Sequence, residues 1–159
     1  MPQPKLPYKV LMIDDSIADM RLMTEAVGLS GLSLIAEATA CYSAEEGLAA
    51  LVSAHLSGET YHTILLDLNM PRQGGVELLG RIKADSRFST IPVFIVTNSD
   101  SHADIKACRE LGADAYFQKP ADFNRLIDFF IAVGYSLEKN KSVSVPAVEK
   151  RYAELKTAA

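Results

Sequence analysis

A regular alternation of strand and helix patterns is the feature that most constrains the fold of this chain. Short apolar segments recur five times, and each is followed by a segment with the periodicity of an amphipathic helix. The predicted strands span residues 8–13, 33–38, 61–66, 91–96 and 115–118. Such alternation with short connections predicts a parallel sheet with helices on both faces. Right-handed crossovers then favour an α/β, doubly wound, flavodoxin-like sheet with the strand order 2-1-3-4-5 and five helices.

Serine residues mark the start of several predicted helices. Three of them stand three positions before an acidic residue, as in a capping box: Ser16 with Asp19, Ser43 with Glu46, and Ser101 with Asp104. Asp122 is the predicted N-cap of the fifth helix. In this interpretation Asp19 serves only the helix that Ser16 opens.

Length and composition exclude several classes of protein. The chain has 159 residues, which fits one domain, and a net charge of −4 without a Lys/Arg cluster, which argues against a nucleic-acid surface. The longest apolar stretch, residues 126–135, contains Asp128 and is too short to span a membrane. Cys41 and Cys108 lack metal-ligand spacing, so we expect reduced thiols. We therefore expect a cytoplasmic protein with no nucleic-acid or membrane partner.

The pattern divides the chain into an N-terminal tail of residues 1–7, a domain of residues 8–135 and a C-terminal tail of residues 136–159. Residues 147–156 of this tail could form a short helix or stay frayed. The predicted fifth helix is apolar almost all round over residues 126–133. Because a surface helix needs a polar outer face, either the C-terminal tail or another subunit covers it.

Polar side chains follow four of the five predicted strands. Asp14 and Asp15 follow the first strand, Asp67 the third, Thr97 the fourth and Lys119 the fifth. Because the carboxyl ends of parallel strands share one edge of the sheet, these groups are expected to converge. Three neighbouring carboxylates repel one another, and a divalent cation with oxygen ligands relieves the repulsion. This donor set favours Mg²⁺, and Mn²⁺ could substitute for it.

The same set of groups predicts phosphoryl transfer. A carboxylate can accept a phosphoryl group as an acyl phosphate, and Asp67 is the predicted acceptor. The transfer depends mainly on positioning and on neutralising charge. Lys119 and the cation would neutralise the phosphoryl oxygens, and Thr97 would donate a hydrogen bond to one of them.

These residues, in this order, resemble the receiver domain of two-component response regulators over residues 8–134. The turn Met70-Pro71 and the pair Gly74-Gly75 fit the same resemblance. Within this family, the chain most resembles stand-alone receivers that partner phytochrome-type histidine kinases. The chain departs from the family at position 98. The family usually has a small residue there, whereas Asn98 would leave less room near the site.

The resemblance implies further site residues. Asn69 would lend its backbone carbonyl to the metal, and the side chains of Asn69 and Ser99 would face the phosphoryl group and tune its lifetime. Thr97 would be the switch hydroxyl and Tyr116 the switch aromatic. The Lys119–Pro120 peptide bond is expected to be cis.

The implied function is a phosphorylation-dependent switch without an output domain. A sensor histidine kinase would phosphorylate Asp67, after which Thr97 moves inward and Tyr116 fills the vacated space. The surface of the fourth helix, the strand 115–118 and the fifth helix would change in response. It would carry the signal by contact with a target or by onward phosphotransfer, and we expect the chain to form a homodimer through the same surface.

Two alternatives remain. One is a receiver-like binding module that has lost phosphorylation, against which the intact set of site residues argues. The other is an aspartyl-phosphate phosphohydrolase of the haloacid dehalogenase type. Such enzymes usually need a second Asp two residues after the nucleophile, where this chain has Asn69, and a cap domain. We therefore expect a phosphoacceptor rather than an enzyme.

Overall fold

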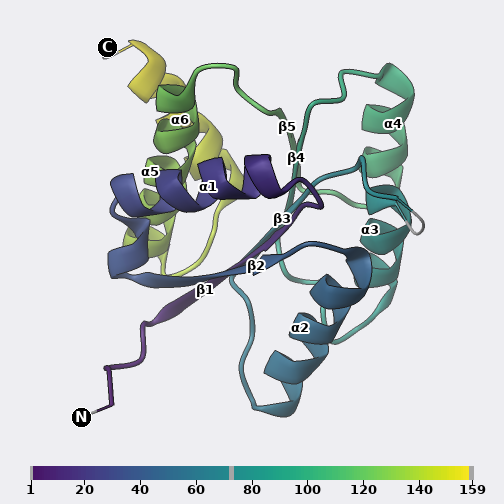
Figure 1. The fold of residues 1–159 in the computed structure, drawn as a ribbon, viewed down its shortest axis with the longest axis horizontal. Coiled ribbons are helices and arrows are strands. Elements are labelled where there is room, and N and C mark those ends of the chain that lie inside the picture. The colour runs from purple at the N-terminus through teal and green to yellow at the C-terminus, as the bar shows by residue number, and fades with distance from the viewer. Residues whose placement is uncertain (1, 72–73, 158–159) are drawn as a thin grey trace.

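The strands form a single five-stranded parallel sheet in the order β2-β1-β3-β4-β5, as the sequence predicts (Figure 1). The structure is a computed structural model that describes residues 2–71 and 74–157. The strands are β1 (Tyr8–Ile13), β2 (Ala36–Cys41), β3 (Thr63–Leu66), β4 (Val93–Thr97) and β5 (Ala115–Gln118).

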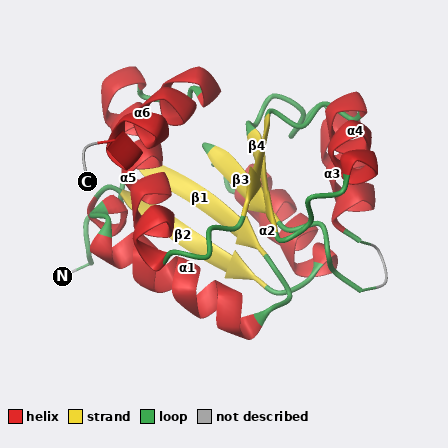
Figure 2. Cartoon of the chain, turned by 90° about the horizontal axis from the view of Figure 1, so that it is seen from above, coloured by secondary structure: helices red, strands yellow, loops and turns green. Residues whose placement is uncertain are grey.

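Helices cover both faces of the sheet. They are α1 (Ile17–Leu29), α2 (Ala44–Leu56), α3 (Gly75–Ala84), α4 (His102–Glu110), α5 (Phe123–Asn140) and α6 (Val145–Thr157), with a 3-10 turn η1 at Leu32–Leu34. Helices α1 and α5 lie on one face and α2, α3 and α4 on the other, while α6 packs on α5 (Figures 1 and 2). The described helices therefore exceed the expected five by α6.

Alternate residues of the central strands serve two separate cores. Val10 and Met12 of β1 pack in the cluster beneath α1 and α5, whereas Leu11 and Ile13 pack in the cluster beneath α2 and α3. Both faces of these strands are buried, which explains why they are continuously apolar in sequence. The rigid centre of the sheet thus ends at the edge where the polar residues begin.

The predicted second strand, residues 33–38, is wrong in its bounds. Gly31 adopts a left-handed conformation with φ 82°, and the turn η1 follows it before β2 begins at Ala36. Glycine adopts this conformation without steric cost. Leu34, within the predicted strand, is 78% exposed. The predicted third and fourth strands each begin two residues too early. Pairing with the neighbouring strand sets where each one begins, at Thr63 and at Val93.

The C-terminal segment folds back over α5. That helix continues to Asn140, so the domain boundary predicted after residue 135 falls within a helix. Val148 of α6 is fully buried, and the ring of Tyr152 lies 5.7 Å from the ring of Phe117 and 6.2 Å from that of Phe129. Of the two ways to cover the apolar fifth helix, the structure therefore shows the intramolecular one.

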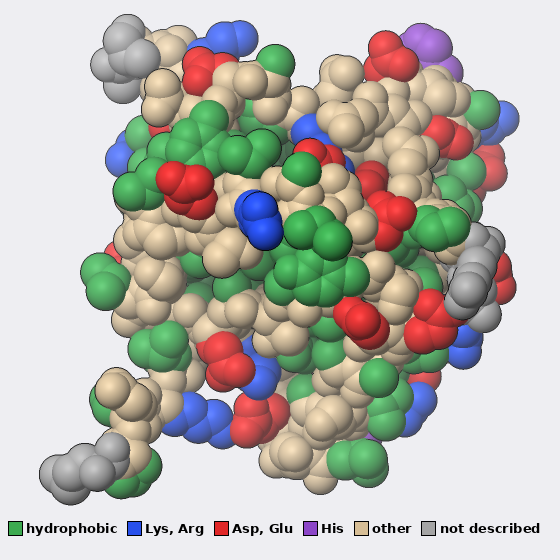
Figure 3. Space-filling view, in the orientation of Figure 1, with side chains coloured by type: hydrophobic (Ala, Val, Ile, Leu, Met, Phe, Trp, Pro, Cys, Tyr) green, Lys and Arg blue, Asp and Glu red, His purple; other side chains and the backbone are tan. Residues whose placement is uncertain are grey.

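The outer surface agrees with the composition. On the face shown in Figure 3, acidic and basic side chains are scattered among apolar ones and form no continuous basic patch. None of the helices in the described part of the chain has the length and hydrophobicity needed to cross a bilayer. Cys41 and Cys108 are both buried and unpaired, as predicted.

We expect Tyr152→Ala to lower the free energy of unfolding by about 2 kcal/mol, less than a fully buried aromatic because Tyr152 is only half-buried. The variant would lose the ring contacts to Phe117 and Phe129 and the stacking of Arg125, whose guanidinium lies 3.8 Å from the centre of the Tyr152 ring. Urea unfolding measures the change. Glu149→Ala, at an exposed position of α6, is the control. Equal stability of Tyr152→Ala and wild type would contradict the docking of α6.

Candidate functional site

The candidate site lies at the carboxyl edge of the sheet. Asp14 directly follows β1, Asp67 follows β3, Thr97 is the last residue of β4, and Lys119 follows β5. Strands β1 and β3 are paired up to their last residues, so Asp14 and Asp67 leave the sheet side by side. The convergence that the sequence predicts is therefore present in the structure.

Lys119 is the centre of the site. Its Nζ lies 2.6 Å from Oδ2 of Asp14, 2.7 Å from Oδ2 of Asp19 and 3.3 Å from Oδ2 of Asp67. Burial by itself would lower the pKa of this ammonium, but the hydrogen bonds to Asp14 and Asp19 and the nearby carboxylate charges raise it above its usual value. Lys119 therefore stays charged at physiological pH.

Three carboxylates form a cluster suited to a cation. One oxygen each of Asp14, Asp15 and Asp67 lies within 4.8 Å of the others, and Asp14 and Asp67 are buried. Burial raises the pKa of Asp14 to about 6, and the charge of Asp67 adds to this, against the opposing hydrogen bonds from Lys119 and Ser16. Carboxylate oxygens are the ligands that hard divalent cations prefer. The residues present thus fit the divalent metal that the sequence predicts.

Thr97 is joined to the loop that follows Asp67. Its side chain is fully buried, and its Oγ1 accepts hydrogen bonds from the side-chain amide of Asn69 at 3.4 Å and the backbone N–H of Ser99 at 3.3 Å. The backbone N–H of Asn69 in turn donates to Oδ1 of Asp67 at 3.3 Å. A continuous set of hydrogen bonds therefore runs from the predicted acceptor to the predicted switch hydroxyl.

Tyr116 and Ser99 are joined to each other. The hydroxyl of Tyr116 donates to the backbone carbonyl of Ser99 at 2.8 Å. The side chain of Ser99 donates to Oδ2 of Asp104 in α4 at 2.7 Å. The structure thus directs the Ser99 hydroxyl to α4, which differs from the predicted orientation towards a phosphoryl group on Asp67.

Two further expectations change. The predicted cis Lys119–Pro120 bond is wrong, because this bond is trans and residues 2–71 and 74–157 contain no cis peptide. The trans isomer is the intrinsically preferred one even before proline, and Lys119 reaches its carboxylate partners with it. Asn98, expected to crowd the site, is exposed and lies at the rim of a small groove beside Lys119.

Asp19 is the site residue that the sequence interpretation missed. Its backbone N–H donates to Oγ of Ser16 at 3.2 Å, as the predicted cap requires. Its carboxylate does not complete the capping box and bonds to Lys119 instead, while the N–H of Ser16 donates to Oδ1 of Asp14. The available signal was position, because side chains in the first turn of a helix point back towards its N-terminus.

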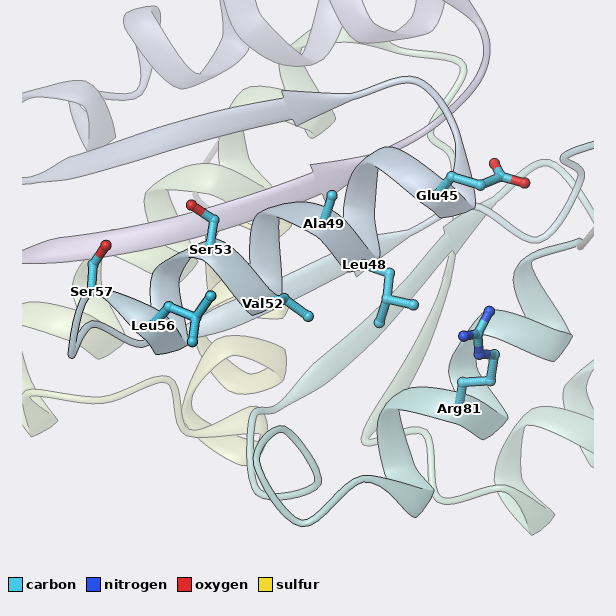
Figure 4. Close-up of a pocket in the computed structure, with 8 residues that line it drawn as sticks. All are labelled: Glu45, Leu48, Ala49, Val52, Ser53, Leu56, Ser57 and Arg81. Carbon is cyan, nitrogen blue, oxygen red and sulfur yellow. The ribbon is translucent and has the colours of Figure 1, made fainter.

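A groove elsewhere on the surface lacks a group of carboxylates around a lysine. It follows the outer side of α2 past Leu48, Val52 and Leu56, with Arg81 of α3 across from Glu45 at one end (Figure 4). Apart from these two charged residues, its lining consists of aliphatic side chains and serines. The convergence of ionic groups therefore identifies the edge of the sheet, rather than this groove, as the functional site.

Comparisons with known proteins agree with this geometry. A family model described as "Response regulator receiver domain" matches residues 10–130. The response regulator Rcp1 of Synechocystis sp. is 31% identical over 146 residues, which cover 89% of this chain and 95% of Rcp1. The structure of the phosphorylated cyanobacterial phytochrome response regulator RcpA matches with a TM-score of 0.74 at 27% identity, covering 86% of this chain and 97% of RcpA. That of the Mn²⁺-bound form of Rcp1 matches with a TM-score of 0.72 at 26% identity, covering 87% and 100%.

The raised pKa of Asp14 predicts how stability depends on pH without metal. In the folded chain the carboxyl of Asp14 has a pKa of about 6, whereas Asp residues of the unfolded chain titrate near about 3.9. As the pH falls, the folded chain therefore binds this proton at a higher pH than the unfolded chain does. Wild type should therefore gain unfolding free energy relative to Asp14→Asn as the pH falls from about 8 to about 4.5. Urea unfolding in the presence of a chelator measures this difference.

Asp85→Asn is the matched control for this measurement. A hydrogen bond from Arg87 lowers the pKa of Asp85 to about 2, so both folded and unfolded chains keep this residue largely charged down to about pH 4.5. The difference between wild type and Asp85→Asn should stay flat over that range. A flat difference for Asp14→Asn as well would contradict the prediction.

Proposed function

Because the chain belongs to the response-regulator receiver domain family, we propose that it is a phosphorylation-dependent switch whose Asp67 accepts a phosphoryl group from a sensor histidine kinase. The observation that carries the proposal is the partly buried ammonium of Lys119, which bonds to Asp67 and to two further carboxylates, those of Asp14 and Asp19. Such an arrangement combines a nucleophile, a fixed positive charge and room for a cation at one point.

In the transfer, a carboxylate oxygen of Asp67 bonds to phosphorus as the bond from phosphorus to the kinase's histidine nitrogen breaks. Lys119 stabilises the charge on the phosphoryl oxygens. Asp14, Asp15, Asp67 and the backbone carbonyl of Asn69 would hold Mg²⁺, or Mn²⁺ in its place. The bound cation supplies neutralisation of the phosphoryl charge.

The switch uses the hydrogen bonds that join the site to β5. Phosphorylation places an acceptor oxygen near Thr97, whose hydroxyl donates a hydrogen bond to it and moves inward. The backbone of Ser99 links the two hydroxyls, because its N–H donates to Oγ1 of Thr97 and its carbonyl accepts from the hydroxyl of Tyr116. A shift of Thr97 therefore reaches Tyr116 and the surface formed by α4, β5 and α5, which is a two-state element biased by local charge.

The remaining parts of the proposal concern partners and location. The kinase is phytochrome-type, supported by the relative RcpA, which is described as a phytochrome response regulator. The phosphorylated protein acts in the cytoplasm, through a target protein or onward phosphotransfer. It is a phosphoacceptor rather than an enzyme, since Asn69 offers no general acid where a phosphohydrolase needs one.

Asp67→Asn should abolish phosphorylation, because an amide is not a nucleophile for phosphorus under these conditions. Incubation with acetyl phosphate and Mg²⁺ followed by intact mass measurement tests this. Wild type should gain the mass of one phosphoryl group and the variant none. Asp85→Asn, which removes a carboxylate beyond α3, should behave as wild type. Phosphorylation of Asp67→Asn to the wild-type level would refute the assignment of the acceptor.

We expect phosphorylation to promote a homodimer through α4, β5 and α5. The contact surface is smaller than the sequence suggests, because α6 already covers the apolar outer side of α5. Sedimentation at tens of micromolar, a range suited to weak dimers, tests this with and without beryllofluoride as a phosphoryl mimic. Only monomer under both conditions would contradict the homodimer and leave the switch acting on other partners.

A further inference from the structure

We propose that Asp19 is a positioning residue that holds the ammonium of Lys119 in place while the other two carboxylates bound to it change their roles. The inference rests on the proposed function, because the change in roles is phosphorylation of Asp67. It concerns a residue whose only evident purpose in the sequence is to begin a helix.

The contacts of Lys119 leave none of its donors unused. An ammonium has three N–H donors, and the structure provides three carboxylates, on Asp14, Asp19 and Asp67. The two short contacts, 2.6 Å and 2.7 Å, go to Asp14 and Asp19, whereas the contact to the acceptor Asp67 is 3.3 Å. Asp19 is therefore one of the two principal anchors of the ammonium.

The other two partners are the ones that phosphorylation alters. Asp67 becomes an acyl phosphate and loses its carboxylate charge. Asp14 belongs to the three-carboxylate cluster that fits the cation, and Asp19 lies outside that cluster. When a phosphoryl oxygen accepts one hydrogen bond from Lys119, Asp19 remains the carboxylate partner that neither belongs to the cation cluster nor carries the phosphoryl group.

Asp19 is attached to a rigid part of the fold. Its backbone N–H is fixed by Oγ of Ser16, and Met20 and Met23 of the same helix are buried in the core. The carboxylate itself is 30% exposed and reaches over the edge of the sheet to Lys119. A catalytic group is positioned best by partners that are themselves held in place.

The charge of Asp19 has a second, opposing effect. The site holds one ammonium and four carboxylates, on Asp14, Asp15, Asp19 and Asp67. Because negative charge is in excess, the carboxylate of Asp19 also repels an anionic phosphodonor. Removing its charge should therefore ease donor binding while loosening Lys119. A lower maximal phosphorylation rate together with a lower half-saturating donor concentration, that is, slower transfer but tighter donor binding, distinguishes positioning from a merely structural role.

The experiment uses the full chain with Asp19→Asn, which keeps the size and one acceptor oxygen but loses the charge. With acetyl phosphate and Mg²⁺, the maximal phosphorylation rate should fall about fivefold through loss of a charge-assisted hydrogen bond. The donor concentration giving half-maximal rate should fall about twofold, as expected for one charge removed across solvent. Asp19→Glu should restore the wild-type donor concentration, because it restores the charge, and only part of the rate.

A second readout needs neither metal nor phosphodonor. The Lys119 ammonium should give a slowly exchanging ¹H–¹⁵N NMR signal in the metal-free wild type and a broadened or missing signal in Asp19→Asn. Glu25→Gln, an exposed carboxylate on the same helix, is the control and should leave the signal, both kinetic parameters and the melting temperature unchanged.

The outcomes separate the two proposals. Unchanged kinetics together with an unchanged Lys119 signal in Asp19→Asn would overturn the role of Asp19. So would equal losses of rate and melting temperature in Asp19→Asn and Glu25→Gln, because these would indicate a general effect on α1. Absence of phosphorylation in wild type would instead refute the proposed function, and the metal-free NMR measurement would still decide whether Asp19 holds Lys119.

Discussion

The ion pairs of Lys119 are the interaction on which the rest of the site depends. One ammonium joins the ends of β1 and β3 and the first turn of α1 to the loop after β5, across 52 to 105 residues of chain. Asp14 and Asp67 are buried and repel each other, so leaving their negative charges without a cationic partner would be costly. Lys119 compensates that charge, and its removal would leave the edge of the sheet without the positive group that the proposed phosphoryl transfer needs.

The compensation is incomplete, and this makes the site responsive. One oxygen of each of three carboxylates lies within 4.8 Å of the others beside a single ammonium, so the cluster holds more negative charge than Lys119 balances. Burial in addition raises the pKa of Asp14 to about 6 even with Lys119 bound to it. A cation would relieve this excess of negative charge, and the phosphoryl group proposed to form on Asp67 would add further negative charge that Lys119 and the cation neutralise. Sites that violate the usual rules of stability in this manner are commonly functional ones.

Strand β5 connects the site to the C-terminal helix. Successive side chains of a strand point to opposite faces, and here Tyr116 packs with the cluster beneath α2 and α3 while Phe117 packs beneath α5 and contacts Tyr152 of α6. A movement of Tyr116 therefore occurs one residue away from the contact that fastens α6. We therefore include α6, together with α4, β5 and α5, in the surface through which the proposed switch acts.

The sequence by itself determined the features that depend on local pattern. Apolar periodicity predicted the parallel sheet and its strand order, the serine caps predicted where α1, α2 and α4 begin, and strand ends predicted that Asp14, Asp67, Thr97 and Lys119 converge. Only the tertiary structure decided which partner each side chain takes. The carboxylate of Asp19 bonds to a lysine 100 residues away, Ser99 turns to α4, and α6 returns to cover α5. These choices depend on distances between segments remote in sequence, and propensity and capping motifs report only on near neighbours along the chain.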